Sequence, residues 1–160
     1  MGNDYTNESL AYNDDYVNDA DVKKVKLPDK RPVLIYNGIK IIDKTLKEII
    51  AIADELNPNS YSNNIKAQWV NEVEAYIQTE IYNVAPLDVV SYADYEESKD
   101  KELSLDAVND KIYLTYLQAM IDFSNKEYQA FNNDIALYNT YIDTYAKWYV
   151  RTHGDGEALI

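Results

Sequence analysis

The sequence predicts a mainly α-helical protein, a small bundle of about four helices with an extended N-terminal arm and a β-hairpin. Apolar residues recur at spacings of three and four in residues 45–81 and in residues 106–151, which is typical of amphipathic helices. An Asn-Gly pair lies between two β-branched apolar runs, which is the pattern of a hairpin. We therefore expect four parts in the 160 residues. They are an arm (1–32), a hairpin (33–44), a helical core (45–153) and a tail (154–160).

The N-terminal arm changes the sign of its charge along its length. Residues 1–22 hold six acidic residues and no basic one, so we expect this part to be disordered alone and ordered by a partner. A basic strip follows, in which Pro28 and Pro32 oppose helix formation. The strip consists of Lys23, Lys24, Lys26, Lys30 and Arg31. Such a run is most often a solvated surface, and the alternative is a docking strip for an acidic neighbouring subunit.

The hairpin is the strongest local signal in the sequence. Asn37 and Gly38 supply the positive φ angles that a type I′ turn needs, and Tyr36 ends the first apolar run. An isolated two-stranded hairpin is marginally stable in water. We therefore expect it to pack on helices or to extend a sheet with another chain.

Two helices are expected after the hairpin. Thr45-Leu46-Lys47-Glu48 is a capping box that begins the first helix, and Asn57-Pro58 ends it. Ser62 then caps a longer helix. Its predicted apolar face consists of Ile65, Trp69, Val73, Tyr76, Ile77 and Ile81. Its predicted polar faces carry Lys66, Gln68, Asn71, Glu72, Gln78 and Thr79.

The rest of the chain is expected to be a long loop and then helix. Residues 83–105 have an acidic middle and no helical period, which predicts a connecting loop. Residues 106–151 are helical in character. We expect a break or kink at Asn132-Asn133-Asp134, because short polar side chains compete for backbone hydrogen bonds. The helix is expected to end before Gly154.

The composition disfavours most catalytic and nucleic-acid-binding classes. Lys and Arg total 15 against 28 Asp and Glu, and the formal charge of -13 opposes attraction to nucleic-acid phosphates. Without cysteine and with His153 as the single histidine, thiolate zinc sites and His-based triads have no residues to use. Four glycines cannot build phosphate-cradling loops of the Rossmann or Walker type. We expect no enzymatic activity and no cofactor.

A carboxylate-bridged metal site and a membrane location are also disfavoured. The carboxylates considered for such a site are Glu72, Glu74, Glu80, Asp122 and Glu127. That architecture needs a Glu-x-x-His pair from each of two helices, and no histidine lies within a predicted helix core. No apolar run approaches the roughly 18 to 20 residues of a membrane span, and the start of the sequence does not resemble a secretory signal. We expect a soluble protein of the cytosol.

Tyrosine is the unusual residue, with 16 copies against two Phe and two Trp. Tyr is favoured at wet protein interfaces, because it offers a large rigid surface with a hydrogen-bonding tip. The aromatic stripe of the last helical region consists of Tyr113, Tyr116, Tyr138, Tyr141, Tyr145 and Trp148. In an acidic chain this stripe predicts core plus subunit interface rather than base stacking, which needs a basic groove. Arg151 and His153 are expected to cap the helix end, or alternatively to begin a tail that docks onto another protein.

Two segments carry a resemblance to a known family. They are residues 56–81, with an Asn-Pro-Asn-x-Tyr turn before a Trp-containing helix, and residues 111–153. The latter hold a Tyr-x-x-Tyr-Leu-x-Ala-x-Ile-Asp helix, an Asn-Asn break and an ending of Tyr-Ala-x-Trp-Tyr-x-Arg-Thr-His. In these features the chain resembles the head-tail connector (adaptor, or head-completion) proteins of tailed bacteriophages. The pattern carries over at residues 57–61, 113–122, 132–133 and 145–153.

The resemblance implies a helical subunit that forms a ring, commonly a dodecamer, in the neck of the virion. Such a ring lies beneath the portal protein, receives the tail or a stopper protein, and lets the genomic DNA pass without sequence-specific binding. The subunit would be made in the cytoplasm of the host bacterium. This chain departs from the family by about 40 further residues at its start and by Leu105–Asn109 where a Pro-Tyr pair is usual. These departures leave the mode of docking to portal or tail open.

Physical arguments agree with a ring, and an alternative stays open. An acidic lumen keeps the genome from sticking to the channel wall, and Tyr-rich helix faces suit repeated contacts between subunits. The candidate interface residues are Lys23, Lys24, Lys26, Lys30, Arg31, Tyr36, Asn37, Gly38, Tyr61, Trp69, Tyr113, Tyr116, Tyr138, Tyr141, Trp148, Arg151 and His153. The alternative is a monomeric acidic helical binding module, such as an inhibitor or DNA mimic that acts on a host protein. A third reading, a carboxylate enzyme, would require a pH-dependent activity that nothing in the sequence suggests.

Overall fold

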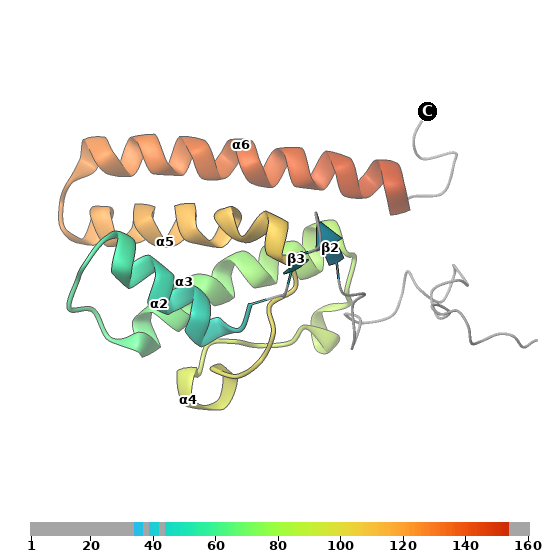
Figure 1. The fold of residues 1–160 in the computed structure, drawn as a ribbon, viewed down its shortest axis with the longest axis horizontal. Helices are drawn as coiled ribbons and strands as arrows, with labels where there is room; N and C mark the ends of the chain where they lie inside the picture. The colour runs from blue at the N-terminus through green and yellow to red at the C-terminus, as the bar shows by residue number, and fades with distance from the viewer. Residues whose placement is uncertain (1–33, 37–38, 42–43, 154–160) are drawn as a thin grey trace, which may run out of the picture.

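The computed structural model describes residues 34–36, 39–41 and 44–153, and this part of the chain is mainly helical, as predicted. Figure 1 shows the arrangement: α6 lies along α5, and α5 in turn covers α2 and α3. The predicted arm, the turn between the strands and the predicted tail lie outside the described residues. No helix in the described ranges combines the length and the apolar character that crossing a membrane requires.

Two short antiparallel strands precede the helices. β2 (Leu34–Tyr36) pairs with β3 (Ile39–Ile41), with Leu34 opposite Ile41 and Tyr36 opposite Ile39. The register therefore sets apolar residues opposite apolar residues at both ends of the pair. Asn37 and Gly38 lie outside the described residues, so the hairpin with its type I′ turn stays a prediction.

Helix α2 (Leu46–Leu56) begins and ends where its caps predict. Thr45 and Glu48 form the capping box: the Thr45 backbone N–H donates to Glu48 Oε1 at 3.0 Å, and the Glu48 N–H donates to Thr45 Oγ1 at 3.4 Å. The helix ends at Leu56 with Asn57 as its C-cap. It buries Leu46, Ile49, Ile50 and Ala53. These side chains join the core between α2, α3 and α5.

Helix α3 (Asn63–Tyr76) begins at its predicted cap, since Ser62 Oγ accepts from the Ile65 N–H at 3.2 Å. It continues as a π-helical turn, η1 (Ile77–Ile81), and Asn83 follows with φ 59. The side chains that it buries as predicted are Trp69, Val73, Ile77 and Ile81.

The predicted faces of this helix were wrong at four positions. Lys66 and Gln78 are buried although they were placed on polar faces, and Ile65 and Tyr76 are exposed although they were placed on the apolar face. Lys66 and Gln78 are buried because each meets polar partners from other segments.

The predicted loop of residues 83–105 contributes to the core. It holds the single-turn helix η2 (Pro86–Asp88) and the short helix α4 (Tyr95–Ser98), and η3 (Ala107–Asn109) follows it. Its buried apolar side chains are Val84, Tyr92, Leu103 and Leu105. Backbone hydrogen bonds from Leu46 N to Lys101 O and from Leu103 N to Lys44 O, both close to 3 Å, tie it to the start of α2.

Helix α5 (Asp110–Ser124) and helix α6 (Tyr128–His153) are separated seven residues earlier than predicted. Lys126 has φ 67, and the Glu127 N–H bonds to Asp122 O at 2.8 Å, which closes α5 in the manner of a Schellman motif. The predicted break at 132–134 was wrong, because α6 runs through it. Asn132 and Asn133 are exposed there, and the helix continues through both residues, so their side chains do not displace the backbone hydrogen bonds.

Helix α6 lies at the edge of the bundle. It packs chiefly on α5, and Figure 1 shows its C-terminal end running past the N-terminal end of α5. Of its 26 residues, Ile142 and Tyr145 alone are buried. Among the described residues, the core is therefore built chiefly from α2, α3 and α5, and α6 adds Ile142 and Tyr145 to it while its other sides are exposed.

Candidate interaction surface

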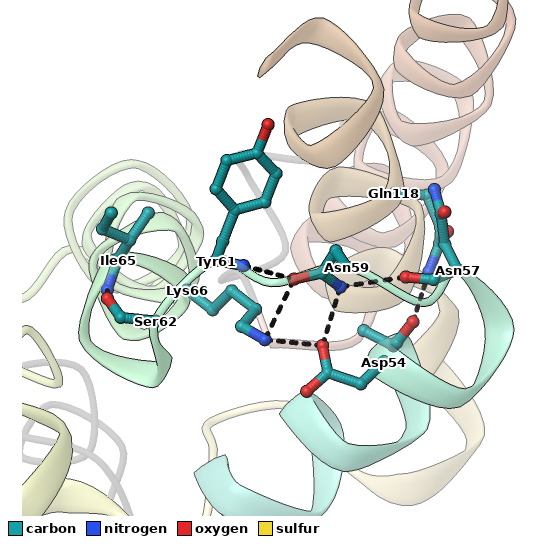
Figure 2. A network of polar contacts seen from close by, with 9 residues as sticks. Asp54, Asn57, Asn59, Tyr61, Ser62, Ile65, Lys66 and Gln118 are labelled. Carbon is teal, nitrogen blue, oxygen red and sulfur yellow. Dashed lines mark hydrogen bonds and ion pairs between the residues drawn. The ribbon is translucent and has the colours of Figure 1, made fainter. Parts of the chain in front are cut away.

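The turn between α2 and α3 holds a polar network (Figure 2). Asn59 donates from Nδ2 to Asp54 Oδ1 at 3.0 Å and to Asn57 O at 2.9 Å, and its Oδ1 accepts from the Tyr61 N–H at 3.0 Å. Lys66 Nζ completes the network on Asp54 Oδ1 at 2.7 Å and on Asn59 Oδ1 at 3.2 Å. The Asn-Pro-Asn-x-Tyr motif thus builds a rigid turn in this chain.

The same turn is attached to α5 and to the turn that follows it. Asn57 Nδ2 donates to Asp122 Oδ1 at 2.9 Å, and the Tyr61 hydroxyl donates to Asn125 Oδ1 at 2.8 Å. The Tyr61 ring also meets Trp69 edge-on, with centroids 5.9 Å apart. Trp69 is buried in the core and Tyr61 is half-buried, so these two predicted interface residues stabilise the subunit itself.

A second network surrounds Glu74, which is completely buried on α3. Its carboxylate accepts hydrogen bonds from the Ser104 backbone N–H at 2.8 Å, from the Ser104 hydroxyl and from the Tyr113 hydroxyl. Burial raises the pKa of Glu74, although these donors favour the charged form. The Tyr113 hydroxyl also accepts from the Leu105 N–H at 3.0 Å. Tyr113, predicted at an interface, is therefore a core residue that fixes residues 104–105.

Gln78 binds an earlier part of the segment 83–105, at Val90. Its side-chain Oε1 accepts from the Val90 N–H at 2.7 Å, and its Nε2 donates to Val90 O at 3.0 Å. The side-chain amide thus matches both backbone groups of one residue, as a neighbouring strand would. Together with Glu74, it explains why a segment without helical period holds a defined position.

Side chains of α3, α5 and α6 meet in a tyrosine cluster. The Tyr116 hydroxyl donates to Glu72 Oε1 at 2.5 Å, and the Tyr116 and Tyr138 rings lie 4.9 Å apart. Burial raises the pKa of Tyr138 to about 12. Tyr76 is exposed and lies close enough to Tyr138 to contribute to its raised pKa. The structure therefore brings together two of the predicted interface residues, Tyr116 and Tyr138, and leaves both half-buried.

The C-terminal end of α6 contributes four aromatic rings, and Tyr82, which follows η1, contributes a fifth. We call this cluster the aromatic end: Tyr82, Tyr145, Trp148, Tyr149 and His153. The Tyr82 and Tyr145 hydroxyls are hydrogen-bonded at 2.8 Å, and the Tyr82 and Tyr149 rings lie 4.8 Å apart. His153 stacks on Tyr149 with centroids 4.1 Å apart, and partial burial lowers the pKa of His153. The stack holds this last turn of α6 against the residue that follows η1.

One side of α6 is partly apolar, and its residues are exposed except for Tyr141, which is half-buried. We call it the α6 flank and define it as Leu137, Tyr141, Trp148 and Arg151, which share a face through their spacings of four, seven and three. Leu137 is 45% exposed and Trp148 is 40% exposed. Lys111 of α5 places its Nζ 4.4 Å from the centre of the Tyr141 ring. The flank thus combines aromatic surface with two cations, Lys111 and Arg151.

The structure assigns the predicted interface residues to different places. The basic strip, Asn37 and Gly38 lie outside the described residues, and Tyr36 lies in β2. Tyr141, Trp148 and Arg151 fall on the α6 flank, and His153 is next to it. The surface residues that sequence reasoning missed are Tyr82, Lys111, Leu137 and Val150. Leu137 could have been found from its spacing to Tyr141, whereas Lys111 is brought in by the packing of α5.

Comparison of the chain with protein-family models, with curated proteins and with solved structures gives no match. Within the residues that the structure describes, no three carboxylate or imidazole side chains lie close enough to hold a metal ion.

Proposed function

We propose that this chain is a structural head-tail connector subunit in the neck of a tailed bacteriophage, without enzymatic activity. In this proposal it forms a ring between the portal and the tail or stopper, around the channel through which the DNA passes. The order of motifs in residues 56–81 and 111–153 supports the family, as described above. The observation that carries the assembly is the exposure of α6.

Helix α6 is covered too little for a helix of its length. A helix in a protein gains most of its stability from packing an apolar face. Within the described part of the chain, α6 fully buries two of its 26 residues, and others such as Tyr138 and Tyr149 are half-buried. Its flank leaves Leu137 and Trp148 to solvent, and Val150 is exposed on another side. A neighbouring subunit that packs against α6 would cover these side chains. Rings repeat such a contact between two different surfaces of each copy.

The charge of the chain suits a channel for DNA. Its net charge is -13, and 28 acidic residues outnumber 15 basic ones. A wall of this sign repels the phosphate backbone, so the genome slides without binding.

The proposal is tested by mixing the purified chain with the portal protein of the same genome and imaging the mixture by electron microscopy. We expect ring-shaped density of uniform diameter attached to one face of the portal. As a variant we use Trp148→Glu, which places a charge on the α6 flank, with Gln68→Glu on the exposed side of α3 as the matched control. We expect the Gln68→Glu control to form rings and the Trp148→Glu variant not to form them. A chain that stays monomeric and ignores the portal would instead favour the acidic binding module.

A further inference from the structure

The α6 flank is cationic in a strongly acidic chain. Lys111 and Arg151 have no carboxylate within ion-pair distance among the described residues, and the nearest acid along α6, Asp143, is paired with Lys147 at 2.9 Å. Most other lysines of the core are neutralised in ion pairs: Lys44–Asp110, Lys47–Asp100, Lys66–Asp54 and Lys99–Glu96. The flank therefore offers positive charge together with exposed aromatic and apolar surface.

Residues 1–22 have the complementary chemistry. They contain six acidic residues, no basic residue, and tyrosines at positions 5, 12 and 16. Acidic side chains can pair with Lys111 and Arg151, and tyrosine rings can pack beside Trp148 and Tyr141. Opposite charges on a surface and a segment raise the rate at which the two associate and disfavour partners of the wrong charge.

The chain is long enough for this segment to reach another subunit. Residues 23–33 separate it from the start of β2 at Leu34. Eleven extended residues span about 35 to 40 Å. This reach is close to the length of α6, whose 26 residues extend about 39 Å. A head-to-tail ring needs two different, complementary surfaces on each copy, and the acidic segment and the α6 flank are such a pair.

We propose that the α6 flank binds residues 1–22 of the adjacent copy, so that each subunit clasps its neighbour through an acidic arm. This proposal rests on the ring proposed above. The α6 flank is thus occupied by residues 1–22 of a second copy, and the basic strip that follows these residues connects the two subunits.

The absence of native cysteine allows a site-specific crosslinking test on the full chain. One population carries Tyr12→Cys and a second carries Thr144→Cys, which lies exposed on α6 between Tyr141 and Trp148. The two are mixed, treated with a short bis-maleimide, and separated on a denaturing gel. The mass of the assembly is measured on the same sample by light scattering. We expect a covalent heterodimer that forms more readily than with Gln68→Cys, an exposed position on α3.

Charge reversal distinguishes specific docking from chance contact. Adding Arg151→Glu to the Thr144→Cys chain is expected to lower the crosslinking yield about fivefold, as expected for the loss of an exposed ion pair. The matched control is Lys126→Glu in the turn that precedes the N-terminal end of α6, which is expected to leave the yield unchanged.

The outcomes separate this inference from the proposed function. Rings without a crosslink above the Gln68→Cys level overturn the clasp and leave the connector standing. A third outcome also overturns the clasp. In that outcome a chain that carries both Tyr12→Cys and Thr144→Cys crosslinks within itself, while the mixture gives no heterodimer. The arm would then cover α6 of its own chain. The absence of any ring overturns both proposals.

Discussion

The buried carboxylate of Glu74 is expected to make stability depend on pH in a defined direction. Glu74 is completely buried, and burial raises its pKa above the ordinary value of 4.5. The folded protein therefore holds this proton more tightly than the unfolded chain does. Its contribution to stability is full below about pH 4.5 and is lost as the pH rises through the raised pKa.

The substitution Glu74→Gln tests this expectation, because it replaces the titrating group by a neutral one of the same shape. In the variant an amide N–H faces the donors of one former carboxylate oxygen, either the Ser104 N–H and the Tyr113 hydroxyl or the Ser104 hydroxyl and the Gln78 amide. This mismatch costs about 1 to 3 kcal/mol. Below its raised pKa the protonated Glu74 gives the wild type a further advantage, so the gap in unfolding free energy between wild type and variant is larger at low pH than at high pH. We therefore expect the loss of unfolding free energy in Glu74→Gln to shrink as the pH rises from 5 to 8.

Urea unfolding followed by circular dichroism at several pH values measures this gap. The remaining carboxylates are common to both proteins, so their titration cancels in the difference. Tyr113→Phe is the companion variant, because it removes the hydroxyl that donates to Glu74 and accepts from Leu105 while Glu74 stays. A gap that is the same at pH 5 and pH 8 for Glu74→Gln would refute the reasoning.

Three further predictions concern stability and assembly. Asp54→Ala leaves the buried Lys66 ammonium without its carboxylate and should lower the free energy of unfolding by about 3 kcal/mol. Asp143→Ala breaks an exposed ion pair and should lower it by less than about 1 kcal/mol. Equal urea midpoints for the two variants would contradict this. Lys126→Gly relieves the positive φ of 67 and should raise the free energy of unfolding by up to about 1 kcal/mol; a lower thermal midpoint would speak against the Schellman ending. Removal of residues 1–42 should leave the helical circular dichroism signal nearly intact and impair assembly; loss of that signal would refute the division of the chain.

The helix boundaries that depend on local chemistry could be predicted from the sequence. Thr45, Glu48 and Ser62 cap their helices through bonds to residues three positions away, and such bonds are visible as short patterns. The end of α5 could not be predicted in this way. A lysine, Lys126, takes the left-handed conformation there, where a glycine or asparagine would have given a signal.

The burial of polar residues on α3 depends on partners that are distant in the sequence. Lys66 meets Asp54 from α2, Gln78 meets Val90, and Glu74 meets Ser104. Periodicity within one helix cannot show such partners, so these residues were assigned to polar faces or left without a structural role. For the same reason residues 83–105 were predicted as a loop, although they supply Tyr92, Leu103 and Leu105 to the core.

The residues of the α6 flank could be predicted from the sequence only where helical spacing places them on one face. Tyr141, Trp148 and Arg151 follow helical spacing on α6 and were singled out from the sequence. Lys111 joins them only through the packing of α5 against α6. Tyr113 has the same residue type as its neighbours in the stripe, but it is buried and donates its hydroxyl to Glu74, a partner that helical spacing alone does not show.

The most direct test of the connector proposal is the mass of the purified chain in solution, alone and with its portal protein, by light scattering behind a sizing column. The proposal predicts a closed multiple of the 18.5 kDa subunit, formed either alone or in fixed ratio on the portal. It also predicts that Trp148→Glu lowers this mass while Gln68→Glu does not. A mass of one subunit under both conditions would contradict the proposal and favour a monomeric acidic binding module.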